Sequence, residues 1–184
     1  MSQLFFQNKA MSYLVLAYPK ISEENFKFIQ DYRKINDPKY FNVVKPHFTI
    51  VFSTSNFSED DFIEEVVKQA HNINKFDFKI KCATINQDDS KTFYHEFLVP
   101  DQGYSDIVKL HDKLYSGKFF DNLRFDIDYI PHIGIGNSED VRVCKKNIDT
   151  LNSKNLLIEG SIQTLDIVKY EDSIITTIKI IELQ

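Results

Sequence analysis

The chain has 184 residues, of which 42% are hydrophobic and 27% are charged. This length suits one domain or two closely packed lobes, and the composition is too apolar for a disordered protein. The formal net charge of -5 argues against a protein that coats long nucleic-acid duplexes, because such binding depends on many phosphate contacts from basic residues. It leaves room for a local basic pocket that takes one small phosphorylated substrate.

The first half of the chain predicts two strands, each followed by a helix. No clear period is present at residues 1–10, but residues 11–18 indicate a buried strand, after which Ser22 caps a helix. The expected apolar face of this helix consists of Phe28, Tyr32 and Ile35. A second strand at 46–52 leads into a helix that begins after Ser58. Apolar residues recur there at helical spacing, at Phe62, Val66, Ala70 and Ile73.

The second half predicts more strands and helices and ends in a hairpin. Strands are expected at 76–82, 92–99 and 130–135, helices at 105–114 and after 138–140, and a hairpin formed by 156–170 and 173–183. Alternation at 76–82 makes Cys82 an inward-facing residue, and Pro100 is expected to end the strand before it. The inward faces of the two helices are Ile107, Leu110 and Leu114, and Val141, Cys144, Ile148 and Leu151. Because hairpins and helices are mixed, we expect an α+β fold rather than a pure βαβ winding.

Cys82 and Cys144 are the only cysteines, and they lack the CxxC spacing of metal-binding or redox pairs. We expect both to be reduced thiols in the core. No signal peptide is visible, and the apolar run at 13–18 is far too short to span a bilayer. We therefore expect a cytoplasmic protein that binds no membrane, with a monomer as the default state.

One segment is repeated nearly half a chain apart. Pro-His-Phe-Thr-Ile at 46–50 and Pro-His-Ile-Gly-Ile at 131–135 each form a strand that leads into a helix start rich in Ser, Glu and Asp. The order of elements is the same in both copies. The repeat predicts two pseudo-symmetric lobes of mostly antiparallel sheet, with flanking helices around a central cleft, and residues 1–184 as a single bilobed domain.

Strand geometry decides what each copy presents to the cleft, because successive side chains point to opposite faces. In the first copy, His47, Thr49 and Val51 share one face, and Phe48, Ile50 and Phe52 share the other. In the second copy, His132, Gly134 and Gly136 lie opposite Ile133 and Ile135. Each strand therefore turns apolar residues to a core and a histidine to the other side, so we expect the two histidines to face each other.

Two facing imidazoles suit the opening of a cyclic phosphodiester. The reaction needs a base that takes a proton from water and an acid that protonates the leaving oxygen, and histidine can do either near neutral pH. Thr49, one strand step beyond His47, can donate its hydroxyl to a non-bridging phosphate oxygen. This scheme needs no metal and no cofactor.

The segments at 47–50 and 132–135 resemble the paired His-x-Thr/Ser-hydrophobic motifs of the 2H phosphoesterases. The most similar branch is the 2'-5' RNA ligase and cyclic phosphodiesterase group, and the resemblance covers most of the chain. It implies that His47 and His132 are catalytic and that Thr49 is the first phosphate-binding hydroxyl. Gly134 stands where the second hydroxyl belongs and departs from the pattern, because it has no side-chain donor. Either its backbone N–H, a water or a neighbour replaces the missing hydroxyl, or the second half-site is weaker.

We expect a metal-independent phosphoesterase that hydrolyses or reversibly ligates 2',3'-cyclic phosphate or 2'-5' linked nucleotide or RNA phosphodiesters. Its partner is then a small phosphodiester or an RNA terminus and not duplex DNA, and either histidine can be the base. An alternative is a catalytically weakened module that binds nucleotides or RNA ends, because Gly134 has lost the hydroxyl. A metallohydrolase that uses some of the five histidines is the second alternative.

Other polar residues have ordinary explanations. His71 lies near a helix C-terminus and His111 on a helix, where structural roles are expected. His95 and Glu96 point to opposite faces of a strand, so they cannot chelate one metal together. Helix capping accounts for the acidic runs at 58–61 and 138–140. Four further residues could hold phosphate or stack a base but more often have surface or core roles: Lys45, Tyr94, Arg124 and Tyr129.

Overall fold

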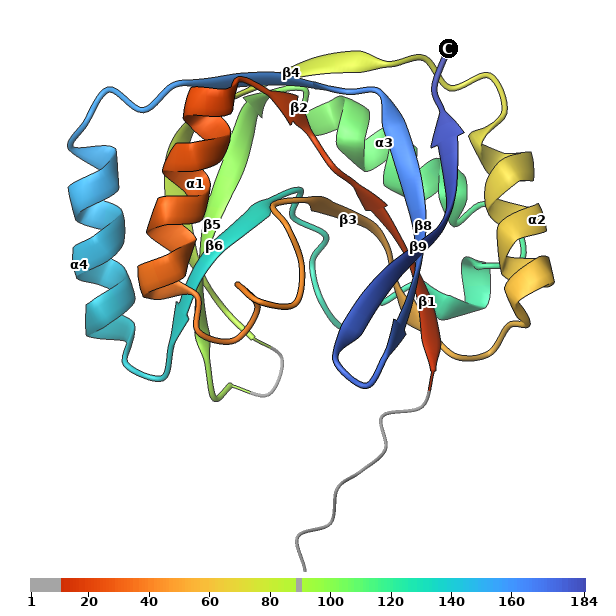
Figure 1. Cartoon of the computed structure of the whole chain (residues 1–184), viewed down its shortest axis with the longest axis horizontal. Helices are drawn as coiled ribbons and strands as arrows, with labels where there is room; N and C mark the ends of the chain where they lie inside the picture. Colours follow the sequence, from red (N-terminus) through yellow and green to blue (C-terminus); the bar gives the residue numbers. More distant parts are fainter. Residues whose placement is uncertain (1–10, 89–90) are drawn as a thin grey trace, which may run out of the picture.

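A computed structural model describes residues 11–88 and 91–184, so the segment at 1–10 lies outside the described residues. The described strands form two antiparallel sheets (Figure 1). The first sheet has the order β3 (Phe48–Thr54), β1 (Ser12–Ala17), β8 (Thr164–Glu171) and β9 (Ile174–Glu182). The second sheet has the order β2 (Lys20–Ile21), β7 (Ile158–Ile162), β4 (Phe76–Gln87), β5 (Tyr94–Gln102) and β6 (Ile133–Ser138).

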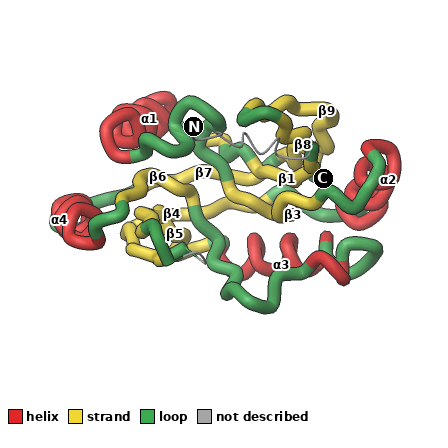
Figure 2. The backbone as a smooth tube through the Cα atoms, turned by 90° about the horizontal axis from the view of Figure 1, so that it is seen from below, coloured by secondary structure: helices red, strands yellow, loops and turns green. Residues whose placement is uncertain are grey.

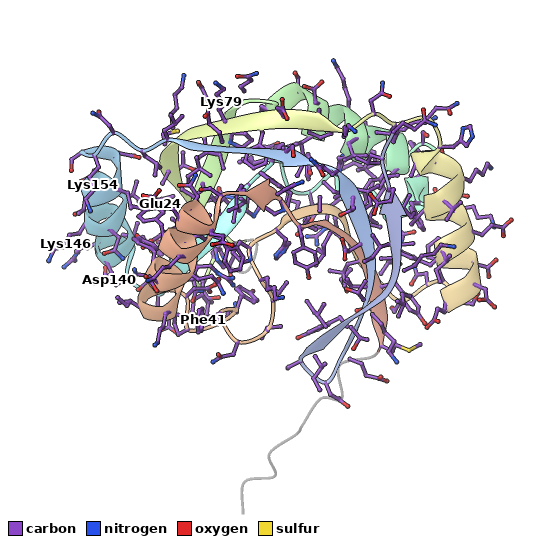
Figure 3. All side chains as sticks on the ribbon, turned by 45° about the horizontal axis from the view of Figure 1, so that its top comes forward. Glu24, Phe41, Lys79, Asp140, Lys146 and Lys154 are labelled. Atoms are coloured by element: carbon purple, nitrogen blue, oxygen red, sulfur yellow. The ribbon has the colours of Figure 1, made fainter. Side chains whose placement is uncertain are left out.

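The helices surround these sheets (Figure 2). They are α1 (Glu23–Asn36), α2 (Glu59–Ala70), α3 (Tyr104–Leu114) and α4 (Val141–Asn152), with a short 3₁₀ turn at Phe120–Asn122. Polar side chains of α4, such as Lys146, point away from the sheets (Figure 3). The predicted α+β fold with two mostly antiparallel lobes is therefore confirmed.

The predicted helix starts are confirmed at atomic detail. Ser22 Oγ accepts a hydrogen bond from the backbone N–H of Asn25 at 3.1 Å, and Ser58 Oγ accepts one from Asp61 at 3.2 Å. Asp140 caps α4 by accepting from the Arg142 N–H at 2.9 Å. Each cap satisfies a backbone donor that the first helical turn leaves free.

Two predicted helix faces are partly wrong. Ile35 is 81% exposed, whereas Ile29 and Arg33 of the same helix are 0% and 2% exposed. The face of α1 that packs inward is therefore rotated toward Arg33, whose guanidinium forms a buried ion pair with Asp37 at 2.9 Å. In α4, Cys144, Ile148 and Leu151 are buried as predicted, but Val141 in the first turn is 40% exposed.

Register shifts overturn the expected alternation in two strands. In β3, Val51 is buried and Phe52 instead lines a cavity, because the pairing with β1 shifts around Val51. In β4, Cys82 is exposed and Ala83 is buried, because the pairing with β5 shifts on both sides of Ile80. A β-bulge adds one residue to a strand and so moves every later side chain to the opposite face.

Two further strand boundaries differ from the expectation. β5 runs through Pro100 to Gln102 instead of ending before the proline. The segment expected as one strand at 156–170 is divided, so that β7 pairs with β4 in the second sheet and β8 pairs with β1 in the first. The predicted hairpin survives as β8 and β9.

One apolar core connects the two sheets. Phe48 of β3 packs edge to face against Phe78 of β4, with ring centroids 5.2 Å apart, and both are buried. Cys144 is also in the core, and both cysteines are free thiols, so only the buried position expected for Cys82 is wrong. In the described part of the chain, no helix has the length and apolar character needed to cross a membrane.

The two lobes place the repeated motifs in equivalent positions. β3 is an edge strand of the first sheet and β6 is an edge strand of the second. The two edges approach each other at the centre of the molecule (Figure 1). His47 and His132 directly precede these strands, so the fold brings both motifs to the space between the lobes.

Candidate active site

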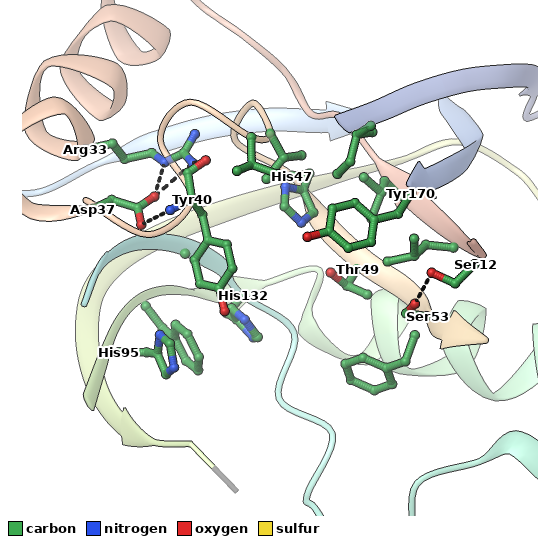
Figure 4. Close-up of a pocket in the computed structure, with 18 of the residues that line it drawn as sticks. Ser12, Arg33, Asp37, Tyr40, His47, Thr49, Ser53, His95, His132 and Tyr170 are labelled. Carbon is green, nitrogen blue, oxygen red and sulfur yellow. Dashed lines mark hydrogen bonds and ion pairs between the residues drawn. The ribbon is translucent and has the colours of Figure 1, made fainter. Parts of the chain in front are cut away.

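A cavity of about 600 Å³ lies between the lobes (Figure 4). All four residues singled out by the paired motifs line it: His47, Thr49, His132 and Gly134. The cavity therefore brings together the residues that the sequence predicted to share a cleft, although their chemical roles stay predictions.

The two histidines make the same backbone contact. His47 Nδ1 lies 2.7 Å from the carbonyl oxygen of Lys45, and His132 Nδ1 lies 2.6 Å from that of Ile130. A carbonyl only accepts hydrogen bonds, so each Nδ1 carries the proton in the neutral ring. This tautomer leaves each Nε2 with a free lone pair that can act as a base or, once protonated, as an acid.

Burial lowers the pKa of both histidines. Desolvation takes the pKa of His47 from 6.5 to about 4, opposed by the Lys45 carbonyl and by the charge of Asp37. Desolvation likewise takes the pKa of His132 to about 4, and the nearby His47 and His95 lower it further. Both rings are therefore neutral at pH 7 in the empty cleft, and an anion bound between them favours the protonated form of the ring that it touches.

The wall around His47 is rich in hydroxyl groups, and we call it the Thr49 half-site. It consists of Ser12, His47, Thr49, Phe52 and Ser53. Ser53 Oγ donates to Ser12 Oγ at 2.7 Å. These side chains can offer hydrogen bonds to phosphate or sugar oxygens.

Two tyrosines hold the bulged segment that carries the Thr49 half-site. Tyr129 Oη donates to the Thr49 carbonyl at 2.9 Å, and Tyr115 Oη accepts from the Phe52 N–H at 3.0 Å. His111 stacks on the Tyr129 ring with centroids 3.7 Å apart. The tyrosines thus give partners to backbone groups of the bulge, which would otherwise be unpaired.

The wall around His132 is aromatic instead, and we call it the Gly134 half-site. It consists of His95, Phe97, His132, Gly134 and Gly136. The His132 ring stacks on Phe97 with centroids 3.5 Å apart, and His95 is stacked with Phe97 at 5.9 Å. Unlike the Thr49 half-site, this wall has no side-chain hydroxyl.

A buried ion pair lines one end of the cavity. Arg33 Nε donates to Asp37 Oδ2 at 2.9 Å, and Arg33 Nη2 donates to the Tyr40 carbonyl at 3.2 Å. Asp37 Oδ1 also accepts from Tyr40 N–H at 3.1 Å and from Asn137 Nδ2 at 2.5 Å. The pair therefore ties α1 to β6 and fixes the loop that carries Tyr40 and leads to His47.

The structure separates the remaining candidates into those near the cavity and those away from it. Lys45, Tyr94, Arg124 and Tyr129 are not among its lining residues. His71 is the C-cap of α2, and His111 is buried on α3, consistent with structural roles. Within residues 11–88 and 91–184, no group of three or more His, Cys, Asp or Glu side chains is arranged to hold a metal.

Sequence reasoning missed several residues that line the cavity. They are Ser12, Arg33, Asp37, Tyr40, Ser53, His95 and Tyr170. For His95 a signal existed, because strand alternation places it opposite the buried Glu96. For Arg33 and Asp37 none existed, since an i, i+4 pair on a helix is typical of a solvated surface.

Comparisons with known proteins agree with this geometry. The family model of the 2'-5' RNA ligase superfamily matches residues 19–173. No curated protein sequence matches the chain.

Solved structures share its fold. A structure of E. coli LigT complexed with 3'-AMP superposes with a TM-score of 0.57 at 12% identity, covering 96% of this chain and 99% of LigT. The structure of LigT complexed with NADP+ gives 0.57 at 13% identity, covering 95% and 99%. The structure of Kluyveromyces marxianus Usb1 gives 0.53 at 9% identity, covering 96% and 98%.

The family match spans most of the chain, and the two histidine motifs meet in one interlobe cavity. The chain belongs to the 2'-5' RNA ligase superfamily, a family of 2H phosphoesterases.

Proposed function

We propose that this protein is a metal-independent phosphoesterase in which residues 1–184 act as one bilobed unit. Its substrates are 2',3'-cyclic phosphate or 2'-5' linked nucleotide or RNA phosphodiesters, which it hydrolyses or reversibly ligates. One observation carries the proposal: His47 and His132 line the same cavity, each with Nδ1 on a backbone carbonyl. Two imidazoles held in the same tautomer supply the base and the acid that the reaction needs.

In hydrolysis of a cyclic phosphate, Nε2 of one histidine takes a proton from water while the water oxygen bonds to phosphorus. The bond from phosphorus to one ribose oxygen breaks, and the other histidine, protonated at the start, gives its proton to that oxygen. In ligation the same steps run in the same direction with the hydroxyl of a second ribose in place of water, so the opened cyclic phosphate becomes a phosphodiester, and cleavage of that linkage is the reverse. Either histidine can be the base, because their backbone contacts are equivalent.

Thr49 supports the same reaction from the first half-site. Its side chain lines the cavity one strand step beyond His47, and its hydroxyl can donate to a non-bridging phosphate oxygen. At the second half-site, Gly134 offers no hydroxyl, so phosphate contacts there come from backbone or water. This asymmetry leaves one hydroxyl donor where the family motif has two.

The charges in the cavity suit an anionic substrate, because a bound anion can itself favour the protonated form of one histidine. The Arg33–Asp37 pair is internally neutral, and both histidines are neutral at pH 7 because desolvation lowers each pKa to about 4. A phosphodiester anion between the rings stabilises one imidazolium, and so raises the pKa of the histidine that serves as acid. The binding of substrate thus prepares the acid.

The missing hydroxyl at Gly134 also supports a second candidate, a module that binds nucleotides or RNA ends with little turnover. The loss of one hydrogen bond to a charged acceptor costs about 1.5–3 kcal/mol. If that hydrogen bond forms only in the transition state, its loss lowers kcat and leaves the affinity for the ligand unchanged.

One experiment separates these functions. The purified protein is treated with EDTA and incubated with nucleoside 2',3'-cyclic phosphates and with 2'-5' and 3'-5' linked dinucleotides, and products are resolved by chromatography. We expect turnover that EDTA leaves intact and that His47→Ala and His132→Ala each lower by roughly 10²–10⁴-fold. Binding without turnover would favour the second candidate, whereas turnover that EDTA removes and a divalent metal restores would favour a metallohydrolase.

A further inference from the structure

The described sheets have four edge strands, and an edge strand with free backbone groups can pair with another chain. β3 and β6 meet at the centre of the molecule (Figure 1), where the hydroxyls of Tyr129 and Tyr115 also pair with backbone groups of β3. β2 has only two residues. β9 is the remaining edge strand and is nine residues long. In the part of the chain that the structure describes, β9 is therefore the long edge on the outside of the molecule.

The open edge of β9 is apolar. Its sequence, IITTIKIIE, contains five isoleucines, no proline and two charged residues. Ile174 and Ile180 are 64% and 56% exposed. Edge strands that stay unpaired are generally short or carry prolines and charges. The composition of β9 is instead typical of a strand that is paired on both sides, because β-branched residues pack well between neighbouring strands.

The turn before β9 determines which backbone groups reach the open edge. Asp172 and Ser173 form this turn, with positive φ angles of 50° and 64°, and the strands pair from Glu171 and Ile174 onward. A β-turn hydrogen-bonds its first and fourth residues, so the N–H of Ile174 is directed to β8. Backbone groups alternate in direction along a strand, and those of Ile175 are therefore directed to the open edge.

The other end of β9 defines the limit of the open edge. Gln184 exchanges two backbone hydrogen bonds of 2.9 Å with the segment at 73–75, which lies on the side away from β8. By alternation from Gln184, the backbone groups of Ile180 are directed to the same side. Between the two ends, the pairing with β8 omits Ile178, so this residue is the extra residue of a bulge.

The open edge at 174–181 consists of two halves that are complementary to each other. When two copies pair in antiparallel orientation about an axis at the middle of this edge, the first half of each copy lies opposite the second half of the other. This register places Ile174 opposite Ile181 and Ile175 opposite Ile180. The bulge falls at the axis in both copies, so each regular stretch of strand pairs with a regular stretch.

The paired isoleucines also match in the face of the sheet that they occupy. Within the chain, Ile175 pairs with Tyr170 and Ile180 pairs with Asp166. These two positions of β8 are four residues apart, so their side chains and those of their partners share one face. That face borders the cavity, because Tyr170 and Ile175 line it (Figure 4). Cross-strand pairs on one face stabilise a sheet.

We propose that two copies of this chain form a dimer through antiparallel pairing of β9, about a twofold axis between Thr177 and Ile178. The two four-stranded sheets then join into one sheet of eight strands. Ile175 and Ile180 of opposite copies exchange backbone hydrogen bonds, because both direct these groups to the open edge. Ile180 of the second copy extends the apolar wall of the cavity beside Ile175. This dimer requires no catalytic activity, so it does not depend on the proposed function.

The contact between the strands is small, so the association depends on concentration. The edge at 174–181 is about 26 Å long, and a sheet is about 10 Å deep. Two such edges bury less than the area of a stable interface, which is about 1,200–2,000 Å². The two copies of Lys179 lie about 10 Å apart along the strands, a distance at which physiological salt screens their repulsion. The monomer expected from the sequence is then the dissociated form of a weak dimer.

Sedimentation velocity of the full chain, from roughly 1 μM to 1 mM, measures the association. We expect the average mass to rise with concentration from that of one chain toward that of two. Ile180→Lys places an ammonium in both symmetry-related apolar pairs, so it should raise the dissociation constant at least roughly tenfold. Val143→Lys changes an exposed apolar residue of α4 and should leave the constant unchanged. Circular dichroism shows whether both variants are folded.

A cross-link tests the register. In the proposed pairing, Thr176 of one copy lies opposite Lys179 of the other, within disulfide reach. In a Cys82→Ser background, which removes the exposed native thiol, the double variant Thr176→Cys/Lys179→Cys should form covalent dimers on mild oxidation. The two positions of one chain are about 10 Å apart, too far for a disulfide within the chain. Each single variant is the control and should stay uncross-linked.

Dimerisation that Ile180→Lys weakens, together with a disulfide that needs both substitutions at Thr176 and Lys179, supports the pairing of β9. A chain that stays monomeric up to roughly 1 mM overturns it. Dimerisation that Ile180→Lys leaves unchanged places the interface elsewhere and overturns it equally. A monomeric full chain that dimerises only after removal of residues 1–10 also overturns it, because that segment and not a second copy would then occupy the edge.

Discussion

The two half-sites of the cavity share their backbone plan and differ in side chains. Each histidine precedes an edge strand and holds its Nδ1 proton on the carbonyl two residues earlier, and each has a pKa lowered to about 4. Two residues further on, one strand has Thr49 and the other has Gly134. The equivalent contacts give both rings the same tautomer, whereas the position two residues further on can differ because it lines the cavity in both strands.

The residues that surround Thr49 and Gly134 also differ, with hydroxyl groups beside Thr49 and aromatic rings beside Gly134. Ser12 and Ser53 extend the hydroxyl-rich wall beside Thr49, and Phe97 and His95 extend the aromatic wall beside Gly134. A ligand in this cavity would therefore meet hydroxyl groups on one side and aromatic rings on the other. The difference teaches that pseudo-symmetry fixes the backbone contacts of the two histidines, while residues from other segments determine the chemical character of each wall.

The largest expected effect tests the part of the site that is symmetric. We expect His47→Ala and His132→Ala each to lower kcat/KM by roughly 10²–10⁴-fold, because each removes one partner of the acid–base pair. Both rings lie at the cavity, so circular dichroism should show an intact fold. Near-normal rates in either variant, measured by chromatography of the products, would break the proposed equivalence of the histidines.

The next effect tests the hydroxyl that only one half-site has. Thr49→Val keeps the shape of the side chain and removes its hydrogen bond, so we expect kcat/KM to fall roughly ten- to a hundredfold, the equivalent of about 1.5–3 kcal/mol. Thr49→Ser restores the hydroxyl and should recover most of the rate. If Thr49→Val had no effect while Thr49→Ser did, the methyl group and not the hydroxyl would matter.

A smaller effect on stability separates the two glycines of the second half-site. Gly136→Ala places a Cβ 2.6 Å from Glu96 Oε2 and 3.1 Å from the Asn36 carbonyl, while Tyr32 and Asn147 hold that carboxylate in place. We expect the free energy of unfolding in urea to fall by about 1–3 kcal/mol, as for other overpacked sites.

Gly134→Ala is the matched comparison, because its Cβ meets nothing within 4 Å. We expect its unfolding free energy to stay within about 0.5 kcal/mol of the wild-type value. A large loss in Gly134→Ala would mean that the open space beside Gly134 is filled in solution.

The last prediction concerns pH and compares the two histidines directly. Their pKa values are lowered on folding from 6.5 to about 4, so between these values the unfolded chain binds protons that the folded chain does not. The free energy of unfolding should therefore fall as pH falls from 7 to 4 and lose this dependence below 4. Each histidine contributes at most about 1.4 kcal/mol per pH unit.

Urea unfolding at pH 7, 5.5 and 4 measures this slope. His47→Ala and His132→Ala should each reduce it by a similar amount, since both rings have similar burial and the same backbone contact. His95 and His111, whose pKa values are also lowered by burial, add to the remaining slope. A reduction seen in only one variant would show that the half-sites differ in desolvation as well as in side chains.

Much of the site was predictable because it depends on local pattern. Two Pro-His segments in matching strands identified His47, Thr49, His132 and Gly134, and all four line the cavity. The hydroxyls and rings around them were not identified, because Ser12, Tyr40 and His95 come from other segments. Local sequence pattern does not predict which side chain of a distant strand lies beside His132.

The same division holds for the fold. The sequence by itself determined the order of the four α-helices and the caps at Ser22 and Ser58, because a helix cap needs only a side chain and a backbone N–H three residues away. Tertiary structure alone decided that Phe52 faces the cavity and Cys82 faces solvent, because a register shift depends on how a strand pairs with its neighbour. It also decided that Arg33 is buried, since the packing of α1 against β6 makes a surface-like ion pair part of the cavity wall.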